Sequence, residues 1–246
     1  MLLSTLLSGG DLKDVLVQLL LTLPVIILAL SVHETAHGYV AWKCGDPTAH
    51  NLGRLTLNPL KHLDPIGFVC MMVFGYGWAK PVPINTRYFR NPKRDMAICA
   101  AAGPLSNLLM GLFSAALLGV VQSWYSYLFY TVGEGFFLTC VWLLVQLLYL
   151  GAAYNFLLMA FNLIPIPPFD GSRIALAFLP PRIYFGVMRY ERQIMFGLLI
   201  AILVLDNFGF SPFGLIANNL TNAISSPISR ALWENAFLPM LRSSII

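Results

Sequence analysis

His33, Glu34 and His37 are the residues whose types and spacing best fit a chemical role, within the pentapeptide His-Glu-Thr-Ala-His. On a helix, side chains four residues apart lie on one face, so both imidazoles can reach a single tetrahedral zinc ion. Glu34 projects beside that face, where it can take a proton from a water and donate it to a leaving amine. A polar helix end at a membrane interface is the alternative explanation, but polar residues ending an apolar span are costly without such compensation.

A catalytic zinc ion takes three protein ligands and keeps one open position, so a third ligand must come from elsewhere. Asp170 is the strongest candidate, because it ends an apolar run after a proline-rich segment that breaks the helix and is followed by Gly171. Capping of the next helix is the alternative role for Asp170. His50 and His62 are rival ligands by residue type, although hydrogen bonding in an irregular loop suits them better.

The composition indicates which elements must position these residues. Of the 246 residues, 58% are hydrophobic and 11% are charged, whereas about 25% charged residues is typical of soluble proteins. We therefore predict an all-α polytopic membrane protein with a single domain over residues 1–246, which excludes a soluble zinc protease. The net charge of +4 is modest and does not indicate nucleic-acid binding.

Long runs without charge predict about four membrane-spanning helices, at residues 13–43, 95–122, 135–164 and 190–208. Between the first two spans, the loop 46–94 is rich in proline and glycine, which excludes a long helix. Because residues 66–78 of this loop are apolar, we expect short strands or re-entrant backbone that lines a wet cavity. The tail 211–246 is expected to be interfacial or loosely ordered.

The positions of Lys and Arg predict the orientation of the chain. These residues are concentrated between the first two spans and between the last two, while the connection 122–134 has none. The positive-inside rule then places the N-terminus outside and both basic connections in the cytosol. Spans one and three therefore end on the cytosolic side, which brings Asp170 level with the histidine pair. Glu134 lies on the external side and Asp95 lies among basic residues, so neither suits the zinc ion.

Four stretches carry a specific combination of motifs. They are residues 33–38 (HETAHG), 57–67 (LNPLKHLDPIG), 103–107 (GPLSN) and 162–171 (NLIPIPPFDG), with a weaker fifth stretch at 78–83 (WAKPVP). In this order, with the first and last each on a predicted span, they resemble the site-2 protease family of intramembrane metalloproteases. Phe169 stands where the family usually has leucine before the aspartate, which is a conservative apolar change.

The resemblance implies one zinc ion per chain, with Glu34 as general base and three ligands, His33, His37 and Asp170. It also implies that Asn107 and Asn162 face the site. There an amide can donate to a developing oxyanion or hold an extended substrate strand. Hydrogen bonding between helices is the alternative role for both asparagines.

The resemblance further implies an intramembrane zinc endopeptidase that cleaves single-span membrane proteins in or near their transmembrane segments. No segment resembles a PDZ domain or a pair of CBS domains, which indicates a minimal member of the family. We expect it in a prokaryotic inner membrane, with the active site facing the cytosol. A non-catalytic zinc-binding scaffold and a transporter are the alternatives, but the intact Glu34 argues against the first and the lack of an internal repeat against the second.

Overall fold

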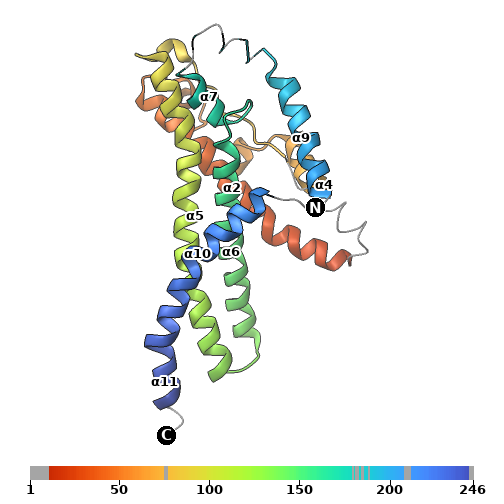
Figure 1. Cartoon of the computed structure of the whole chain (residues 1–246), viewed down its shortest axis with the longest axis vertical. Coiled ribbons are helices and arrows are strands. Elements are labelled where there is room, and N and C mark those ends of the chain that lie inside the picture. The colour runs from red at the N-terminus through yellow and green to blue at the C-terminus, as the bar shows by residue number, and fades with distance from the viewer. Residues whose placement is uncertain are drawn as a thin grey trace.

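The computed structural model describes residues 11–74, 77–178, 189–207 and 212–243, together with positions 180, 183, 186 and 187. In these ranges, three helices are long and apolar enough to cross a membrane: α2 (Leu12–Lys43), α5 (Pro92–Thr131) and α6 (Phe136–Asn162). They pack against one another, with α5 and α6 side by side along the long axis of the molecule (Figure 1). The helical membrane class expected from the composition is therefore confirmed.

The starts of these helices follow local signals in the sequence. Asp11 caps α2, because its side chain accepts a hydrogen bond from the Lys13 N–H at 3.2 Å. Pro92 lies in the first turn of α5, where its missing N–H costs no hydrogen bond. Asp95, one turn into α5, accepts from the Asn91 N–H at 2.9 Å. Both helices thus begin where the chain satisfies N–H groups that the helix itself leaves free.

A short turn joins α5 to α6, so the two helices form an antiparallel hairpin. Gly133 in this turn has a φ of +76°, a left-handed conformation that glycine adopts without strain. Phe156 is fully buried in the core of the bundle, in one cluster with Ala115, Ala152 and Ala217. Small residues opposite one large ring allow the helices to approach closely, as is common between membrane helices.

The chain beyond residue 211 forms a packed helix, α10 (Pro212–Leu232), followed by a π-helical turn, η3 (Trp233–Phe237), and by α11 (Leu238–Ser243). An interfacial position for this tail stays a prediction, but the expectation of loose order is wrong for residues 212–243. The reason is a run of small residues at four-residue spacing, Ala217, Thr221 and Ser225, which are all buried where α10 meets α5 and α6. The Thr221 hydroxyl donates to the Ala217 carbonyl at 2.8 Å, so its burial leaves no donor unpaired.

The fourth predicted span, 190–208, falls on helix α9 (Glu191–Asn207). This helix has 17 residues and is about 26 Å long, somewhat short of a hydrocarbon core of about 30 Å. It lies apart from α5, α6 and α10 (Figure 1). The count of four spans therefore stays a prediction.

The loop 46–94 contains only short helical elements among its described residues: α3 (Thr48–Asn51), η1 (Pro59–Lys61), α4 (Pro65–Phe74) and η2 (Thr86–Tyr88). The strands expected at 66–78 are not found in its described part, apart from one isolated antiparallel bridge between Leu63 and Ala79. Asp64 decides the outcome, because its carboxylate accepts from the N–H groups of Ile66 and Gly67 at 3.0 and 2.9 Å and so starts a helix. Whether this segment re-enters the membrane stays a prediction.

Candidate metal centre

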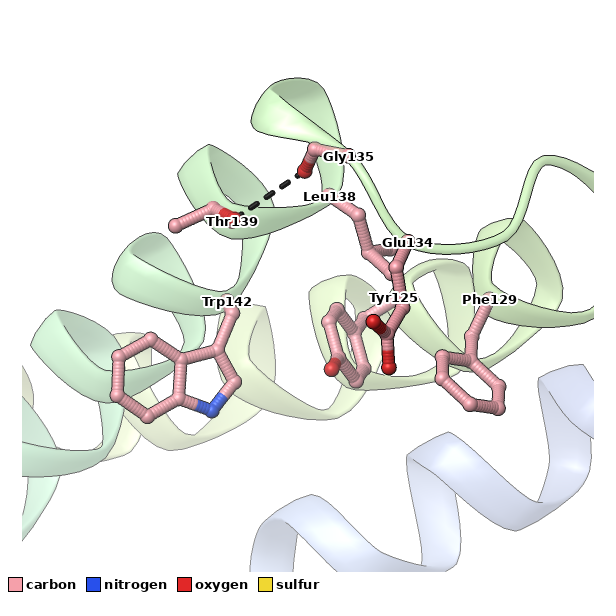
Figure 2. Close-up of a pocket in the computed structure, with 7 residues that line it drawn as sticks. All are labelled: Tyr125, Phe129, Glu134, Gly135, Leu138, Thr139 and Trp142. Atoms are coloured by element: carbon pink, nitrogen blue, oxygen red, sulfur yellow. Dashed lines mark hydrogen bonds between the residues drawn. The ribbon is translucent and has the colours of Figure 1, made fainter.

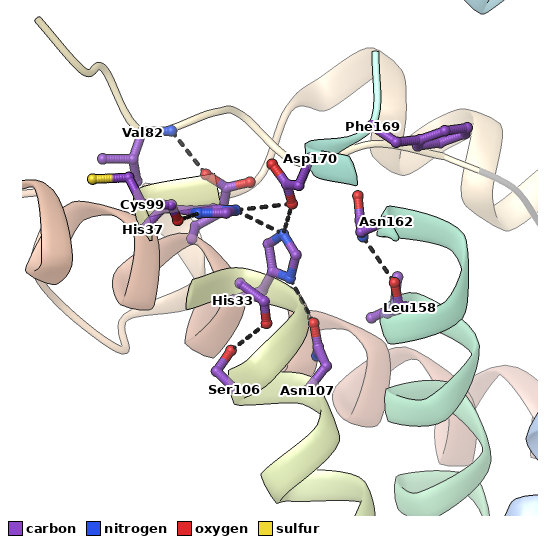
Figure 3. A network of polar contacts seen from close by, with 12 residues as sticks. His33, His37, Val82, Cys99, Ser106, Asn107, Leu158, Asn162, Phe169 and Asp170 are labelled. Carbon is purple, nitrogen blue, oxygen red and sulfur yellow. Dashed lines mark hydrogen bonds and ion pairs between the residues drawn. The ribbon is translucent and has the colours of Figure 1, made fainter. Parts of the chain in front are cut away.

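The structure brings His33 and His37, one turn apart on α2, together with Asp170 at the start of α7 (Asp170–Leu176) (Figure 3). The Nε2 atoms of the two histidines lie 3.0 Å apart, and each lies 3.1 Å from Oδ2 of Asp170. The histidines are 4% and 7% exposed. Three potential ligand atoms therefore converge on one point inside the protein.

The outer nitrogens of both imidazoles are held by oxygen acceptors. Nδ1 of His33 lies 2.5 Å from Oδ1 of Asn107, and Nδ1 of His37 lies 2.7 Å from the carbonyl oxygen of Cys99. Asn107 presents its oxygen to His33 because its amide nitrogen donates to Asn155 at 2.8 Å. Since these oxygens accept, both Nδ1 atoms carry the proton, and the neutral imidazoles turn their Nε2 lone pairs toward the centre.

This donor set fits a divalent cation. The Nε2 lone pairs of the two histidines and Oδ2 of Asp170 lie 3.0–3.1 Å apart, where they repel one another. One proton among these atoms would form only one of the three possible hydrogen bonds, so it could not relieve the whole repulsion. Zinc bonds of about 2.0–2.1 Å in a tetrahedron place neighbouring ligand atoms about 3.3 Å apart, close to the separations here. Two imidazoles and one carboxylate also leave the fourth position open, as in catalytic zinc sites.

Gly103 of α5 lies against the Nε2 edges of the two imidazoles. A Cβ atom at this position would overlap the rings of both His33 and His37. Asn107 follows one turn later on the same face of the helix. The GPLSN stretch therefore lets α5 approach the histidines and supplies the acceptor that orients one of them.

The segment before α7 aims the Asp170 carboxylate at the histidines. The ring of Phe169 packs edge-on against Phe161, with centroids 4.8 Å apart. The Ser172 hydroxyl donates to the Phe169 carbonyl at 2.7 Å. Burial tends to raise the pKa of Asp170, but the two imidazoles beside its carboxylate hold this pKa below its usual range. The N-terminus of α7 has no side-chain cap, so the Asp170 carboxylate is engaged with the histidines and not with the helix.

Glu34 is held beside the cluster by the backbone of the extended segment 80–85. Its Oε2 accepts a hydrogen bond from the Val82 N–H at 2.8 Å, and its charge acts on the imidazole of His37. No described residue makes a hydrogen bond to Oε1 of Glu34, so this second oxygen can act on a proton.

Two charged residues fix this extended segment at its ends. The Arg54 guanidinium donates to the carbonyl oxygens of Lys80 and Pro81 at 2.9 and 3.3 Å. Asp46, which is fully buried, accepts from the Asn85 N–H at 2.6 Å. Neither role was predicted from the sequence. The Asp-Pro-Thr pattern after α2 was the available signal for Asp46, because its carboxylate also binds the Thr48 N–H at 3.0 Å.

The asparagines predicted to face the site differ in their surroundings. Asn107 is fully buried, and both ends of its amide are engaged by protein groups, so the contacts favour orienting His33 over binding an oxyanion. Asn162 lies beside Asp170 in Figure 3, and its amide nitrogen donates to the Leu158 carbonyl at 3.0 Å. Asn162 is half-buried and therefore partly accessible, whereas Asn107 is not, and a contact of Asn162 with substrate stays a prediction.

The rival ligands lie outside the cluster. His50 stacks on Trp42 with ring centroids 5.0 Å apart, and Nε2 of His62 lies 2.7 Å from the Thr56 carbonyl oxygen. Asp95 pairs with Arg94 at 2.9 Å, and Glu134 lies at the far end of the α5–α6 hairpin. Among the described residues, only His33, His37 and Asp170 form a group suited to a metal ion.

Comparisons with known proteins agree with this geometry. The model of Peptidase family M50 matches residues 21–205. "Putative zinc metalloprotease YwhC" of Bacillus subtilis (strain 168) is 40% identical over 156 residues, which cover 63% of this chain and 68% of that protein. "Putative zinc metalloprotease Rip2" of Mycolicibacterium smegmatis is 29% identical over 154 residues, 59% of this chain and 52% of that protein.

No solved structure matches the chain. The chain spans about two thirds of the first relative and about half of the second. The family match covers both histidines, Glu34 and Asp170, and it confirms the resemblance to the site-2 proteases. The chain therefore belongs to Peptidase family M50.

Proposed function

We propose that the chain is a zinc endopeptidase that cleaves single-span membrane proteins in or near their transmembrane segments. The observation that carries the proposal is the cluster of His33, His37 and Asp170, with Glu34 beside it, on helices of a membrane protein. Membership in a peptidase family and the names of the two relatives support the same chemistry.

His33, His37 and Asp170 would hold one zinc ion per chain. When bound, zinc supplies Lewis-acid activation of water and of the scissile carbonyl group. Glu34 takes a proton from the attacking water while the water oxygen bonds to the carbonyl carbon. The same carboxyl then returns the proton to the leaving nitrogen as the C–N bond breaks. Asn162 is proposed to steady the developing oxyanion or the substrate strand.

Substrate access is proposed to use the extended segment 80–85. A transmembrane helix must unwind locally before one of its peptide bonds can enter a site of this kind. The unwound strand would then lie along 80–85 and pair with only those backbone groups that the segment leaves free, because Pro81 and Pro83 have no N–H and the N–H groups of Val82 and Asn85 are already bound. This arrangement places the scissile bond next to Glu34, because Val82 in the same segment binds that carboxylate.

The test is cleavage of a single-span reporter after reconstitution with the wild-type protein or with Glu34→Gln. We expect Glu34→Gln to retain about one zinc ion per chain by elemental analysis but to leave the reporter intact, because the amide cannot take up the proton. Cleavage by Glu34→Gln at the wild-type rate would refute the assignment of the base. Zinc binding without cleavage by the wild type would favour the scaffold alternative, and solute transport without zinc would favour a transporter.

The natural substrates are sought by comparing the membrane proteomes of cells that express the wild type or Glu34→Gln. Single-span proteins that accumulate only with Glu34→Gln are the candidates. The proposed location is a prokaryotic inner membrane, with the N-terminus outside and the active site open to the cytosol. Cys140 is exposed near the α5–α6 turn, so a variant retaining only this cysteine should react with an impermeant thiol reagent from outside the cell.

A further inference from the structure

A cleft of about 350 Å³ lies at the α5–α6 turn, at the end of the hairpin away from the metal centre (Figure 1, Figure 2). Its walls come from the last turns of α5 and the first turns of α6, and they carry the aromatic rings of Tyr125, Phe129 and Trp142. This volume is within the range of small-molecule sites. The proposed peptidase chemistry makes no use of this cleft.

Glu134 brings the only charge to this cleft. It is the only charged residue in the sequence between Asp95 and Asp170. In Figure 2 its carboxylate lies between the rings of Tyr125 and Phe129. Among the described residues, no hydrogen bond or ion pair engages this carboxylate. An exposed carboxylate that lies beside aromatic rings and has no basic partner among the described residues attracts a cation, because both the charge and the π-systems favour it.

Two neutral donors complete the cleft. In Figure 2 the hydroxyl group of Tyr125 and the indole nitrogen of Trp142 both point into the space between α5 and α6. Neither group makes a hydrogen bond within the part of the chain that the structure describes. An O–H and an N–H that share a cleft with a carboxylate suit a ligand with both a positive and a negative group. The carboxylate binds the positive group, and the two donors bind oxygens of the negative group.

The position of the cleft indicates the source of such a ligand. Both helices of the hairpin are long and apolar enough to cross a membrane, so we expect their connecting turn at the level of the lipid headgroups. We propose that this cleft binds the headgroup of a phospholipid that carries a primary ammonium group. Glu134 pairs with the ammonium group among the three rings, and the Tyr125 hydroxyl and the Trp142 N–H donate to the phosphate.

The experiment uses the full chain, stripped of lipid in detergent and titrated with phosphatidylethanolamine or phosphatidylglycerol of the same acyl chains. Bound lipid is counted by native mass spectrometry. We expect phosphatidylethanolamine to bind more tightly, and Glu134→Gln to weaken this binding about tenfold, as for the loss of a charged hydrogen bond. Trp142→Leu should weaken it as well. Glu234→Gln is the matched control, because Glu234 is an exposed glutamate in η3 outside the cleft.

Equal binding of the two lipids would overturn the proposal, and so would equal affinities of Glu134→Gln and Glu234→Gln for phosphatidylethanolamine. Free ethanolamine and phosphoethanolamine are tested as soluble competitors. Competition by either at micromolar concentration would overturn the assignment to a membrane lipid, because it would point to a soluble amine as the ligand. Melting temperatures in detergent show whether each variant is folded, and Trp142→Leu provides a second test of the site if Glu134→Gln is unstable.

Discussion

The hydrogen bond from His33 to Asn107 leads to a prediction that separates orientation of the ligand from catalysis. Asn107 is fully buried, accepts from Nδ1 of His33 at 2.5 Å and donates to Asn155 at 2.8 Å. Asn107→Ala removes both of these hydrogen bonds at once. It leaves Nδ1 of His33 without its acceptor and leaves the side-chain oxygen Oδ1 of Asn155 without its donor.

The expected loss follows from these contacts. Removal of the group that hydrogen-bonds the non-ligating nitrogen of a metal-binding histidine lowers metal affinity about 10–100-fold, which corresponds to about 1.4–2.7 kcal/mol. The buried oxygen of Asn155 that loses its donor costs a further 1–3 kcal/mol or so of folding stability. Asn107→Ala should therefore weaken both zinc binding and the fold, whereas a residue that only holds an oxyanion would weaken neither.

The assay is competition for zinc between the purified protein and a chromogenic chelator, together with thermal unfolding in detergent. Ser106→Ala is the control, because the Ser106 hydroxyl donates to the Gly103 carbonyl at 2.7 Å and makes no contact with either histidine side chain. It should bind zinc as the wild type does. Wild-type zinc affinity in Asn107→Ala, combined with a lower cleavage rate, would refute the orienting role and restore a direct role in catalysis.

Three further predictions concern the same centre. Gly103→Ala should lose zinc binding and destabilise the fold by about 1–3 kcal/mol, because a methyl group there overlaps both imidazoles. Gly151→Ala, whose new Cβ would meet only the Ser114 hydroxyl at 3.2 Å, should stay folded and bind zinc. Asp170→Ala should abolish zinc binding measured by elemental analysis while circular dichroism stays unchanged, and retained stoichiometric zinc would exclude it as a ligand. Asp46→Ala should keep zinc but lower kcat/KM about tenfold, because the segment that holds Glu34, and along which the substrate is proposed to lie, loses one of its anchors. Equal kcat/KM in the wild type and Asp46→Ala would show that Arg54 fixes this segment alone.

The membrane class, and the two histidines with the glutamate between them, can be predicted from local features of the chain. These features are readable because they are local. Helical spacing puts His33 and His37 on one face of a helix. The low fraction of charged residues indicates that much of the chain is surrounded by lipid and not by water. The distribution of Lys and Arg also placed Asp170 level with this pair, and the structure brings its carboxylate within 3.1 Å of both rings.

Packing decided the features that sequence reasoning missed or assigned differently. The tail appeared weakly ordered because its polar residues dilute its hydrophobicity, but small side chains at four-residue spacing let α10 pack closely on the hairpin. The prediction of strands at 66–78 was wrong. A helix forms there because Asp64 caps its first N–H groups, despite the β-branched and aromatic side chains that follow.

The role of Asn107 depends most completely on tertiary structure. Its two ends meet His33 and Asn155, which lie 74 and 48 residues away along the chain. An amide can donate and accept equally well, so its residue type is compatible with an oxyanion, a substrate strand or a neighbouring helix. Only the packing of α2, α5 and α6 determines which partners its oxygen and nitrogen reach, because periodicity along one segment carries no information about contacts with another.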